Sequence, residues 1–255
     1  MCLSIIRLTG YLHLTTQSKE GKLIVTIGGE KGGVGKTTLA VHLAYMRTRA
    51  GADPVLIDAD PQGSATNFCA ARDERGAKPR IQSIQKLGKG LAHEIRGLAE
   101  RYGDIIIDTG GRDSAELRLA LLVSDLVVVP INPSAYNWWT LEKIDELVGE
   151  ANLSNPDLRA EVLLNRLPGL PSLRNRKVRT AAERLHGAGF RNLSVLESVL
   201  VERTVLQDNE EFGLTAFEPS AVREKIDMLA CGELAAVYKE IYKHDYAVGS
   251  PALVV

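Results

Sequence analysis

The stretch that decides the fold is KGGVGKTT, from Lys31 to Thr38. It follows the apolar run LIVTIGG, Leu23 to Gly29, and it leads into a helical pattern that begins at Lys36. A glycine-rich turn between a strand and a helix brings backbone N–H groups onto phosphate oxygens, and the helix N-terminus adds the positive end of its dipole. The stretch therefore predicts a phosphate-binding loop after the first strand.

The residue types in this loop suit a nucleotide. Gly32, Gly33 and Gly35 allow the backbone to turn tightly. Lys36 is placed to contact β- and γ-phosphates, and the Thr37 hydroxyl is placed to ligate Mg²⁺. A glycine-rich turn that binds no nucleotide is the alternative. The candidate nucleotide-binding residues are Lys31, Gly32, Gly33, Val34, Gly35, Lys36, Thr37 and Thr38.

One position departs from the strict pattern G-x-x-x-x-G-K-[ST]. Glu30 stands where the first glycine belongs, and Lys31 follows it directly. A second cation at a phosphate site neutralises charge that develops on the transferred phosphoryl group, as an arginine finger does. Lys31 is therefore a candidate catalytic residue.

Apolar runs alternate with helical patterns from Lys22 onward. The runs are nearly continuous in Val, Ile and Leu, which is typical of strands buried on both faces of a parallel sheet. The alternation predicts right-handed βαβ units and an α/β fold with a helix-covered sheet. The expected strands are 23–29, 54–60, 104–109, 125–131, 161–167 and 194–200, and the expected helices are 36–50, 91–101, 114–123, 138–151, 173–186 and 220–243.

Composition limits the function further. The 255 residues are 45% hydrophobic and 25% charged, which indicates one soluble globular domain, 22–255, behind an N-terminal extension, 1–21. A formal net charge of −1 excludes coating of nucleic acid by bulk charge. The three cysteines form no CxxC pair, which argues against zinc, iron–sulfur or disulfide chemistry and favours the cytoplasm. The sequence contains no apolar run of the ~18–20 residues that a membrane span needs.

Two motifs together resemble a known family. KGGVGKTT and LIDADPQGSAT, Leu56 to Thr66, resemble the deviant Walker A ATPases of the ParA/MinD group, and DPQGSAT resembles ParA-type partition proteins. The resemblance covers most of the chain from Leu23 to about Tyr246. It implies a P-loop NTPase with a twisted, mostly parallel sheet, ATP and Mg²⁺ as cofactors, and weak ATP hydrolysis. It also implies a homodimer that sandwiches two ATP molecules, with Lys31 reaching the partner's nucleotide.

The same resemblance implies roles for three residues outside the loop. Asp60 would position the attacking water and serve the metal, Asp108 would hold Mg²⁺ through water, and Asn165 would read the adenine edge. Each has a structural alternative: Asp58, on the same face as Asp60, caps the next turn, Asp108 merely ends its strand, and Asn165 forms a turn. After Asp108 relatives often have Thr-Pro-Pro, whereas this chain has Thr109-Gly110-Gly111-Arg112.

A basic stretch points to a partner. Residues 172–191 carry six Lys and Arg against one acid, Glu183, which predicts a basic helical strip for non-specific DNA. The candidate contacts are Arg174, Arg176, Lys177, Arg179 and, by resemblance, Arg203. The family resemblance implies a nucleoid-associated ATPase whose hydrolysis a centromere-binding ParB- or ParG-like protein stimulates.

Other functions remain open at this point. The same machinery could position another cargo, or act on a membrane as MinD does. Acids among the C-terminal basic residues, Glu233, Glu240 and Asp245, argue against an amphipathic membrane helix, so no membrane partner is expected. A biosynthetic ATP-dependent ligase or amidotransferase is a further alternative. It is disfavoured because no cysteine has the setting of a nucleophile and DPQGSAT is not expected there.

Overall fold

The computed structural model describes residues 22–111, 113–133 and 138–246, so the expected extension, 1–21, lies outside the described residues. The strands are β1 (Ile24–Ile27), β2 (Pro54–Ala59), β3 (Ser83–Gln85), β4 (Asp104–Thr109), β5 (Leu126–Ile131), β6 (Arg159–Leu167) and β7 (Ser194–Val201). The helices are α1 (Lys36–Arg49), α2 (Ser64–Glu74), α3 (Leu91–Ala99), α4 (Ala115–Leu121), α5 (Trp138–Asn152), α6 (Pro171–Ala188), α7 (Thr204–Asp208), the 3₁₀ helix η1 (Glu210–Phe212) and α8 (Met228–Tyr242).

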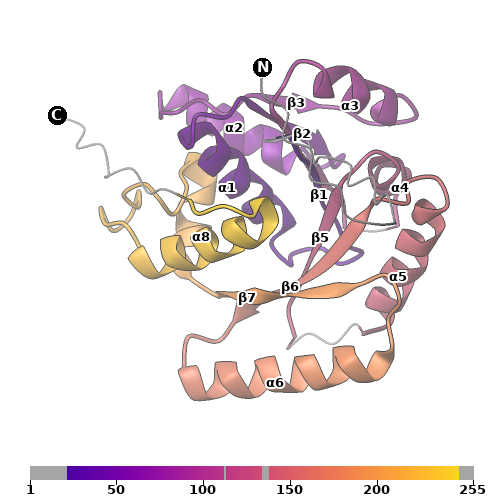
Figure 1. Cartoon of the computed structure of the whole chain (residues 1–255). Coiled ribbons are helices and arrows are strands. Elements are labelled where there is room, and N and C mark those ends of the chain that lie inside the picture. Colours follow the sequence, from indigo (N-terminus) through magenta and orange to yellow (C-terminus); the bar gives the residue numbers. More distant parts are fainter. Residues whose placement is uncertain (1–21, 112, 134–137, 247–255) are drawn as a thin grey trace, which may run out of the picture.

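The strands form one parallel sheet in the order β3-β2-β4-β1-β5-β6-β7. Helices α1, α2 and α8 cover one face, and α3, α4, α5 and α6 cover the other (Figure 1). The predicted α/β class is confirmed. The limits of a single domain, 22–255, stay a prediction.

Burial on both faces explains the continuous apolar runs. Successive side chains of a strand point to opposite faces. Val25, Ile27 and Ile106 accordingly join the cluster beneath α1 and α8, whereas Ile105 and Ile107 join the cluster beneath α3. All six residues of β2 and of β4 are buried.

Helix α1 lies in the middle of the molecule and is buried on almost every side. One polar residue in it, His42, is 2% exposed, and both of its ring nitrogens are used. Nδ1 donates to the Thr38 carbonyl at 2.6 Å, and Nε2 accepts from the Ala216 N–H at 3.0 Å. Burial lowers the pKa of His42 to about 4, so the ring is neutral at pH 7 and ties α1 to the 216 loop.

Helix α2 and strand β3 are not among the elements that the sequence predicts. One of the four buried residues of α2 is charged: Arg72, which is completely buried beside Ala65, Phe68 and Cys69. It pairs with both carboxylate oxygens of Glu218 at 2.8 and 3.0 Å and donates to the carbonyls of Pro79 and Gly213. Glycine is required at position 213, because a Cβ there would collide with the backbone of Arg72 and of Phe68. A charge in a core position conceals the apolar periodicity of this helix.

The closing helix begins later than predicted, at Met228 and not at residue 220. Asp227 caps it, since its Oδ1 accepts the N–H groups of Leu229 and Ala230, both at 3.0 Å. The eight residues before the helix form an irregular segment with a turn at 221–223, and Glu224 in it has a φ of 54°.

Helix α8 also closes the outer edge of the sheet. The carboxylate of Glu240 accepts the N–H groups of Glu197 and Ser198 on β7, at 2.8 and 2.6 Å. Glu233 accepts the N–H of Val201 at 3.0 Å. Backbone donors of the edge strand are therefore paired with side chains of a covering helix.

The order of the strands places a binding site. The chain crosses from one half of the sheet to the other at β1, which lies between β4 and β5. Ligands of open α/β sheets bind outside the carboxyl ends of the strands at such a switch point. The loop from Lys31 to Thr38 starts there, beside the ends of β2 and β4.

Candidate functional site

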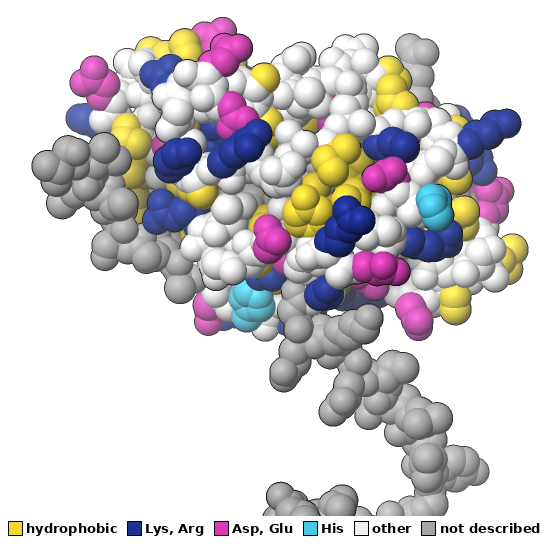
Figure 2. Space-filling model, turned by 90° about the horizontal axis from the view of Figure 1, so that it is seen from above, with side chains coloured by type: hydrophobic (Ala, Val, Ile, Leu, Met, Phe, Trp, Pro, Cys, Tyr) yellow, Lys and Arg dark blue, Asp and Glu magenta, His cyan; other side chains and the backbone are white. Residues whose placement is uncertain are grey.

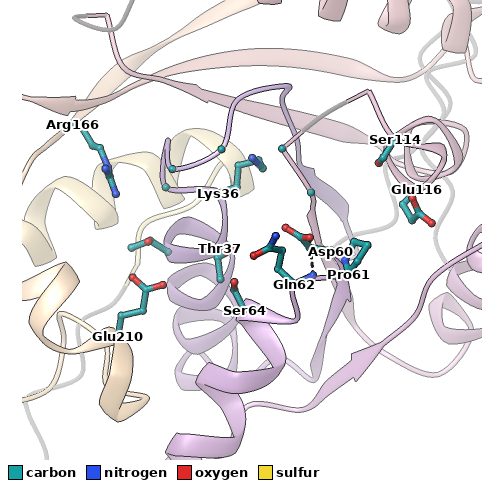
Figure 3. A pocket seen from close by; sticks show the side chains of 16 residues that line it. Lys36, Thr37, Asp60, Pro61, Gln62, Ser64, Ser114, Glu116, Arg166 and Glu210 are labelled. Carbon is teal, nitrogen blue, oxygen red and sulfur yellow. Dashed lines mark hydrogen bonds between the residues drawn. The ribbon is translucent and has the colours of Figure 1, made fainter.

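A cavity of about 760 Å³ opens at the carboxyl ends of the strands, over the N-terminus of α1 (Figure 3). It brings together most of the residues predicted to bind nucleotide or metal. Seven of them line it: Gly32, Gly33, Gly35, Lys36, Thr37, Thr38 and Asp60. The cavity thus joins the loop after β1 to the segment after β2.

The backbone of the loop needs its glycines. Gly33 and Gly35 have φ angles of 72° and 92°, the left-handed region that other residues rarely adopt. A Cβ on Gly35 would stand 2.5 Å from the amide nitrogen of Asn165. That amide donates to the Val34 carbonyl at 2.7 Å, and its oxygen accepts the Arg166 N–H at 2.8 Å. These bonds hold the loop against β6 and favour a structural role for Asn165; its adenine contact stays a prediction.

Lys36 is the cation that the phosphate-binding loop contributes to the cavity. Its Nζ donates to the Lys31 carbonyl at 2.8 Å, and the residue is 6% exposed. Burial lowers the pKa of Lys36, against the opposing pull of Asp108 and Asp60. The free-energy cost of burying this ammonium exceeds what its interactions with the carboxylates return. Binding of a polyanion such as a chain of phosphates would therefore be favourable.

The residues expected to hold a metal fit a hard cation. Thr37 Oγ1 donates to Asp108 Oδ2 at 2.6 Å, so the hydroxyl and the carboxylate are adjacent. The other oxygen, Asp108 Oδ1, is buried without a hydrogen-bond partner among the described residues. Burial raises the pKa of Asp108 to about 7. Oxygen donors of this kind are those that Mg²⁺ prefers, and a cation there would satisfy the orphaned oxygen.

The two aspartates at the carboxyl end of β2, Asp58 within the strand and Asp60 just after it, differ in what they can do. Asp58 is fully buried, and its carboxylate accepts from the Asp60 N–H, the Thr66 N–H and the Thr66 hydroxyl, at 3.1, 2.8 and 2.8 Å. Asp60 lines the cavity, and Oδ1 accepts the Gln62 N–H at 3.0 Å. Asp58 therefore holds the turn that presents Asp60, in line with its structural alternative.

Two glycines after β4 explain the departure from Thr-Pro-Pro. A Cβ on Gly111 would stand 2.7 Å from the backbone nitrogen of Gly32, so only glycine allows this loop to contact the phosphate-binding loop. A Cβ on Gly110 would lie 3.4 Å from the carboxylate of Asp60. Arg112, the fourth residue of the departure, lies outside the described residues.

Three residues near the start of the loop, Glu30, Lys31 and Val34, are not part of the described lining of the cavity. Val34 is buried, at 5% exposure. Glu30 forms an ion pair with Lys143 of α5 at 3.2 Å. The side chain in the first glycine position therefore points to α5 and leaves the cavity open.

The predicted DNA contacts fall in two places. Arg174, Arg176, Lys177 and Arg179 lie on α6, of which the structure buries only Ala181 and Leu185. Arg203 lies elsewhere, before α7, where its guanidinium pairs with Glu233 at 2.5 Å and with Asp227 at 3.7 Å. Since carboxylates occupy it, Arg203 is the weakest of the five candidates.

Several lining residues were not predicted from the sequence. Pro61, Gln62 and Ser64 belong to the DPQGSAT segment, whose motif was noticed without roles for these residues. Arg166 and Glu210 reach the cavity from β6 and η1. No spacing in the sequence connects these two with the loop. The remaining lining residues are Gly110, Gly111, Ser114 and Glu116.

The fold and this loop define a class of protein. The model of the family described as "CobQ/CobB/MinD/ParA nucleotide binding domain" matches residues 25–216, and the chain belongs to that family. The resemblance to the ParA/MinD group is thereby confirmed, as is the expected nucleotide as a ligand of this domain.

Particular relatives narrow the class. The chain is 38% identical over 117 residues to the chromosome-partitioning ATPase Soj of Thermus thermophilus, which is 43% of this chain and 46% of that protein. It is 24% identical over 204 residues to maintenance of carboxysome distribution protein A of Halothiobacillus neapolitanus. The match covers 78% of this chain and 91% of that protein. A Borrelia burgdorferi B31 protein assigned to plasmid partition, solved with AMPPNP, has the same fold, with a TM-score of 0.64, 20% identity and coverage of 87% and 99%. The chain is thus similar both to a chromosome-partitioning ATPase and to a carboxysome distribution protein.

Proposed function

We propose that this protein hydrolyses ATP with Mg²⁺ and uses the cycle to partition DNA. In the proposed cycle, ATP drives formation of a homodimer that sandwiches the nucleotides, and this dimer binds non-specific DNA on the nucleoid. A centromere-binding partner then stimulates hydrolysis, which releases the dimer from the DNA. The observation that carries the proposal is one cavity in which Lys36, the Thr37–Asp108 pair and Asp60 meet the glycine loop. The similarity to Soj supports partition as the purpose of the cycle.

The side chains of the cavity suggest how the residues divide the work. Lys36 would bind the β- and γ-phosphates, and Thr37 and Asp108 would hold Mg²⁺ or its waters. Bound Mg²⁺ would supply neutralisation of phosphate charge. Asp60 would orient the attacking water and accept its proton, and Lys31 would reach the nucleotide of the partner subunit.

The role of Asp60 can be tested by substitution. Asp60→Ala should leave ATP binding intact and lower the hydrolysis rate by roughly 10²–10⁴-fold, the usual contribution of a general base. Steady-state phosphate release and ATP titration measure the two effects separately. Asp157→Ala, which removes an exposed acid outside the cavity, is the control and should hydrolyse ATP like the parent. Unchanged turnover in Asp60→Ala would assign the role to another residue.

A DNA surface is best supported on α6. Arg176, Arg179 and Arg184 are exposed on this helix, which forms the outer layer at the lower edge of Figure 1. Figure 2 views the molecule from above, the side opposite to α6, and there basic and acidic side chains are intermixed. Clustered rather than dispersed cations are what a phosphate backbone requires.

The proposed switch predicts DNA binding that depends on nucleotide. Duplex DNA without a specific site should bind the protein with ATP and not with ADP or without nucleotide, at fixed salt. Fluorescence anisotropy measures this directly. Equal binding in all three states would contradict the switch, and absence of binding in every state would contradict DNA as the surface.

The strip on α6 predicts a change in salt dependence. Replacing Arg174, Arg176 and Arg179 by alanine should weaken DNA binding and reduce the slope of log K against log salt by up to about 3, at about 0.9 per lost phosphate contact. The matched control replaces three arginines outside α6 in the same way: Arg80, Arg96 and Arg101. If both triple variants show the parental slope, the strip is only a solvated face.

Another cargo is the second candidate. The similarity to the carboxysome distribution protein extends over 78% of this chain, more than the similarity to Soj. Both functions would use the same ATP-dependent DNA binding, so the partner protein decides between them. None of the helices in the described ranges has the length and apolar character of a bilayer span. A peripheral, MinD-like association is the remaining alternative, and liposome flotation with ATP tests it.

A further inference from the structure

Two charged side chains stand at a junction that the proposed mechanism does not use. Arg166 and Glu210 line the main cavity and also a second, smaller cavity of about 30 Å³ beside it. Gly35 and Thr38 are the other residues that the two cavities share. The junction therefore lies against the end of the phosphate-binding loop and the first turn of α1.

The backbone directs Arg166 into this junction. Its φ is 54°, the left-handed region, which costs energy for a residue with a Cβ. The Asn165 side chain holds this conformation by accepting the Arg166 N–H at 2.8 Å. In Figure 3 the guanidinium of Arg166 points from β6 toward the carboxylate of Glu210, which rises from η1 below it.

Glu210 is held close to a cation without pairing with it. Within the described part of the chain, no ion pair of 4 Å or less joins Arg166 to Glu210. Burial raises the pKa of Glu210, and the charge of Arg166 opposes that shift. Two half-buried, opposite charges that face each other across an open junction leave room for a group that contacts both.

The orientation of a bound nucleotide identifies that group. Asp60 and Gln62 lie on one side of Lys36, and Arg166 and Glu210 lie on the other (Figure 3). The water-positioning aspartate must stand at the γ-phosphate, and Lys36 binds the β- and γ-phosphates. The chain of phosphates therefore runs from Asp60 past Lys36 toward the junction, where the α-phosphate and the ribose follow.

We propose that Glu210 accepts a hydrogen bond from a ribose hydroxyl of the nucleotide and that Arg166 contacts its α-phosphate. The proposal rests on the proposed function for the presence of a nucleotide and adds the recognition of its sugar. A hydroxyl donates readily to a carboxylate, and a guanidinium pairs with a phosphate oxygen, so each charge finds its complement in the same ligand. Glu210 then distinguishes a nucleotide that carries the contacted hydroxyl from one that lacks it.

The ribose contact is tested with nucleotides that lack one hydroxyl. Calorimetry on the full chain compares ATP with 2′-deoxy-ATP and 3′-deoxy-ATP, each with Mg²⁺. The parent should bind ATP roughly ten-fold more tightly than at least one of the two deoxy compounds, which is the contribution of a hydrogen bond to a charged acceptor. Glu210→Ala should reduce that ratio to about one. Glu211→Ala, the neighbouring exposed acid, should keep it and is the matched control.

The outcomes separate this inference from the function on which it rests. If the parent binds all three triphosphates equally, or if Glu210→Ala keeps the parental ratio, the ribose contact is wrong while nucleotide binding stands. If the parent binds none of them, the proposed function fails as well. The ratio of affinities is insensitive to a general loss of binding, and circular dichroism establishes that each variant is folded.

The second half of the proposal has its own measurement. Arg166→Ala should lower the affinity for ADP by roughly ten-fold, the contribution of a charge-assisted contact, and leave the ratio of ATP to deoxy-ATP unchanged. Arg191→Ala removes an exposed arginine outside the cavity and should bind ADP like the parent. Parental ADP affinity in Arg166→Ala would overturn the α-phosphate contact.

Discussion

Lys36→Ala is expected to lower the affinity for ATP by about 100-fold or more, because the lysine would make charge-assisted bonds to two phosphates, each of about 1.5–3 kcal/mol. Its ammonium is buried near Asp108 and Asp60, whereas Arg166, the other Lys or Arg among the described residues that line the cavity, lies on the side away from Asp60 (Figure 3). Isothermal titration with ATP and Mg²⁺ measures the loss. The variant should also lose every activity that depends on the ATP state.

Exposed Lys89 provides the control for this substitution. Lys89→Ala removes the same charge outside the cavity and should bind ATP like the parent. Thermal unfolding of both variants shows whether the fold is retained. Full ATP affinity in a folded Lys36→Ala protein would contradict the assignment of the phosphate-binding loop.

Arg72→Ala should lower the free energy of unfolding by about 3–5 kcal/mol, the usual cost of removing one partner of a buried ion pair. The arginine satisfies the Glu218 carboxylate and the carbonyls of Pro79 and Gly213 in a place from which water is excluded. Removing it takes a donor from each of these acceptors, although Thr215 still donates to Oε2 of Glu218, and it opens a cavity under α2. Equilibrium unfolding in urea measures the change.

A surface pair of the same chemistry gives the comparison. Arg80 pairs with Asp73 at 3.0 Å, but the two side chains are 65% and 40% exposed. Arg80→Ala should therefore change the free energy of unfolding by less than about 1 kcal/mol. If Arg72→Ala fails to fold, Glu218→Gln can be measured in its place, because it keeps the shape of the side chain and removes the charge. Glu218→Gln should lower the free energy of unfolding, but by less than Arg72→Ala. Similar stability of the Arg72 and Arg80 variants would contradict the role of the buried pair.

The sheet could be predicted because its strands are buried on both faces. Burial on both sides removes polar residues from a strand, and a continuous apolar run of this kind is visible without a structure. β3 escaped prediction because it is three residues long, with no fully buried residue. α2 escaped because Arg72 occupies a core position through partners that lie more than 130 residues away in the sequence.

From the residues alone, the site was predictable where one segment contains it, whereas the roles expected of Asp60 and Asp108 came from the family resemblance. The phosphate-binding loop is contiguous, and its glycines, lysine and threonine have fixed spacing, so chemistry could be assigned to each residue. Arg166 and Glu210 meet because β6 and η1 are brought together by packing, which local sequence does not encode. The adenine contact expected of Asn165 stays a prediction, because its amide is engaged by backbone groups of its own chain.

The carboxylates of α8 along β7 have a consequence for how copies of this protein can associate. An edge strand with free N–H groups is a template on which another chain can add a strand and begin aggregation. Glu240 and Glu233 occupy three such donors, and they do so with negative charge. The helix therefore blocks addition of a further strand at this edge, which would matter in the proposed cycle, where two copies of the protein associate and then separate.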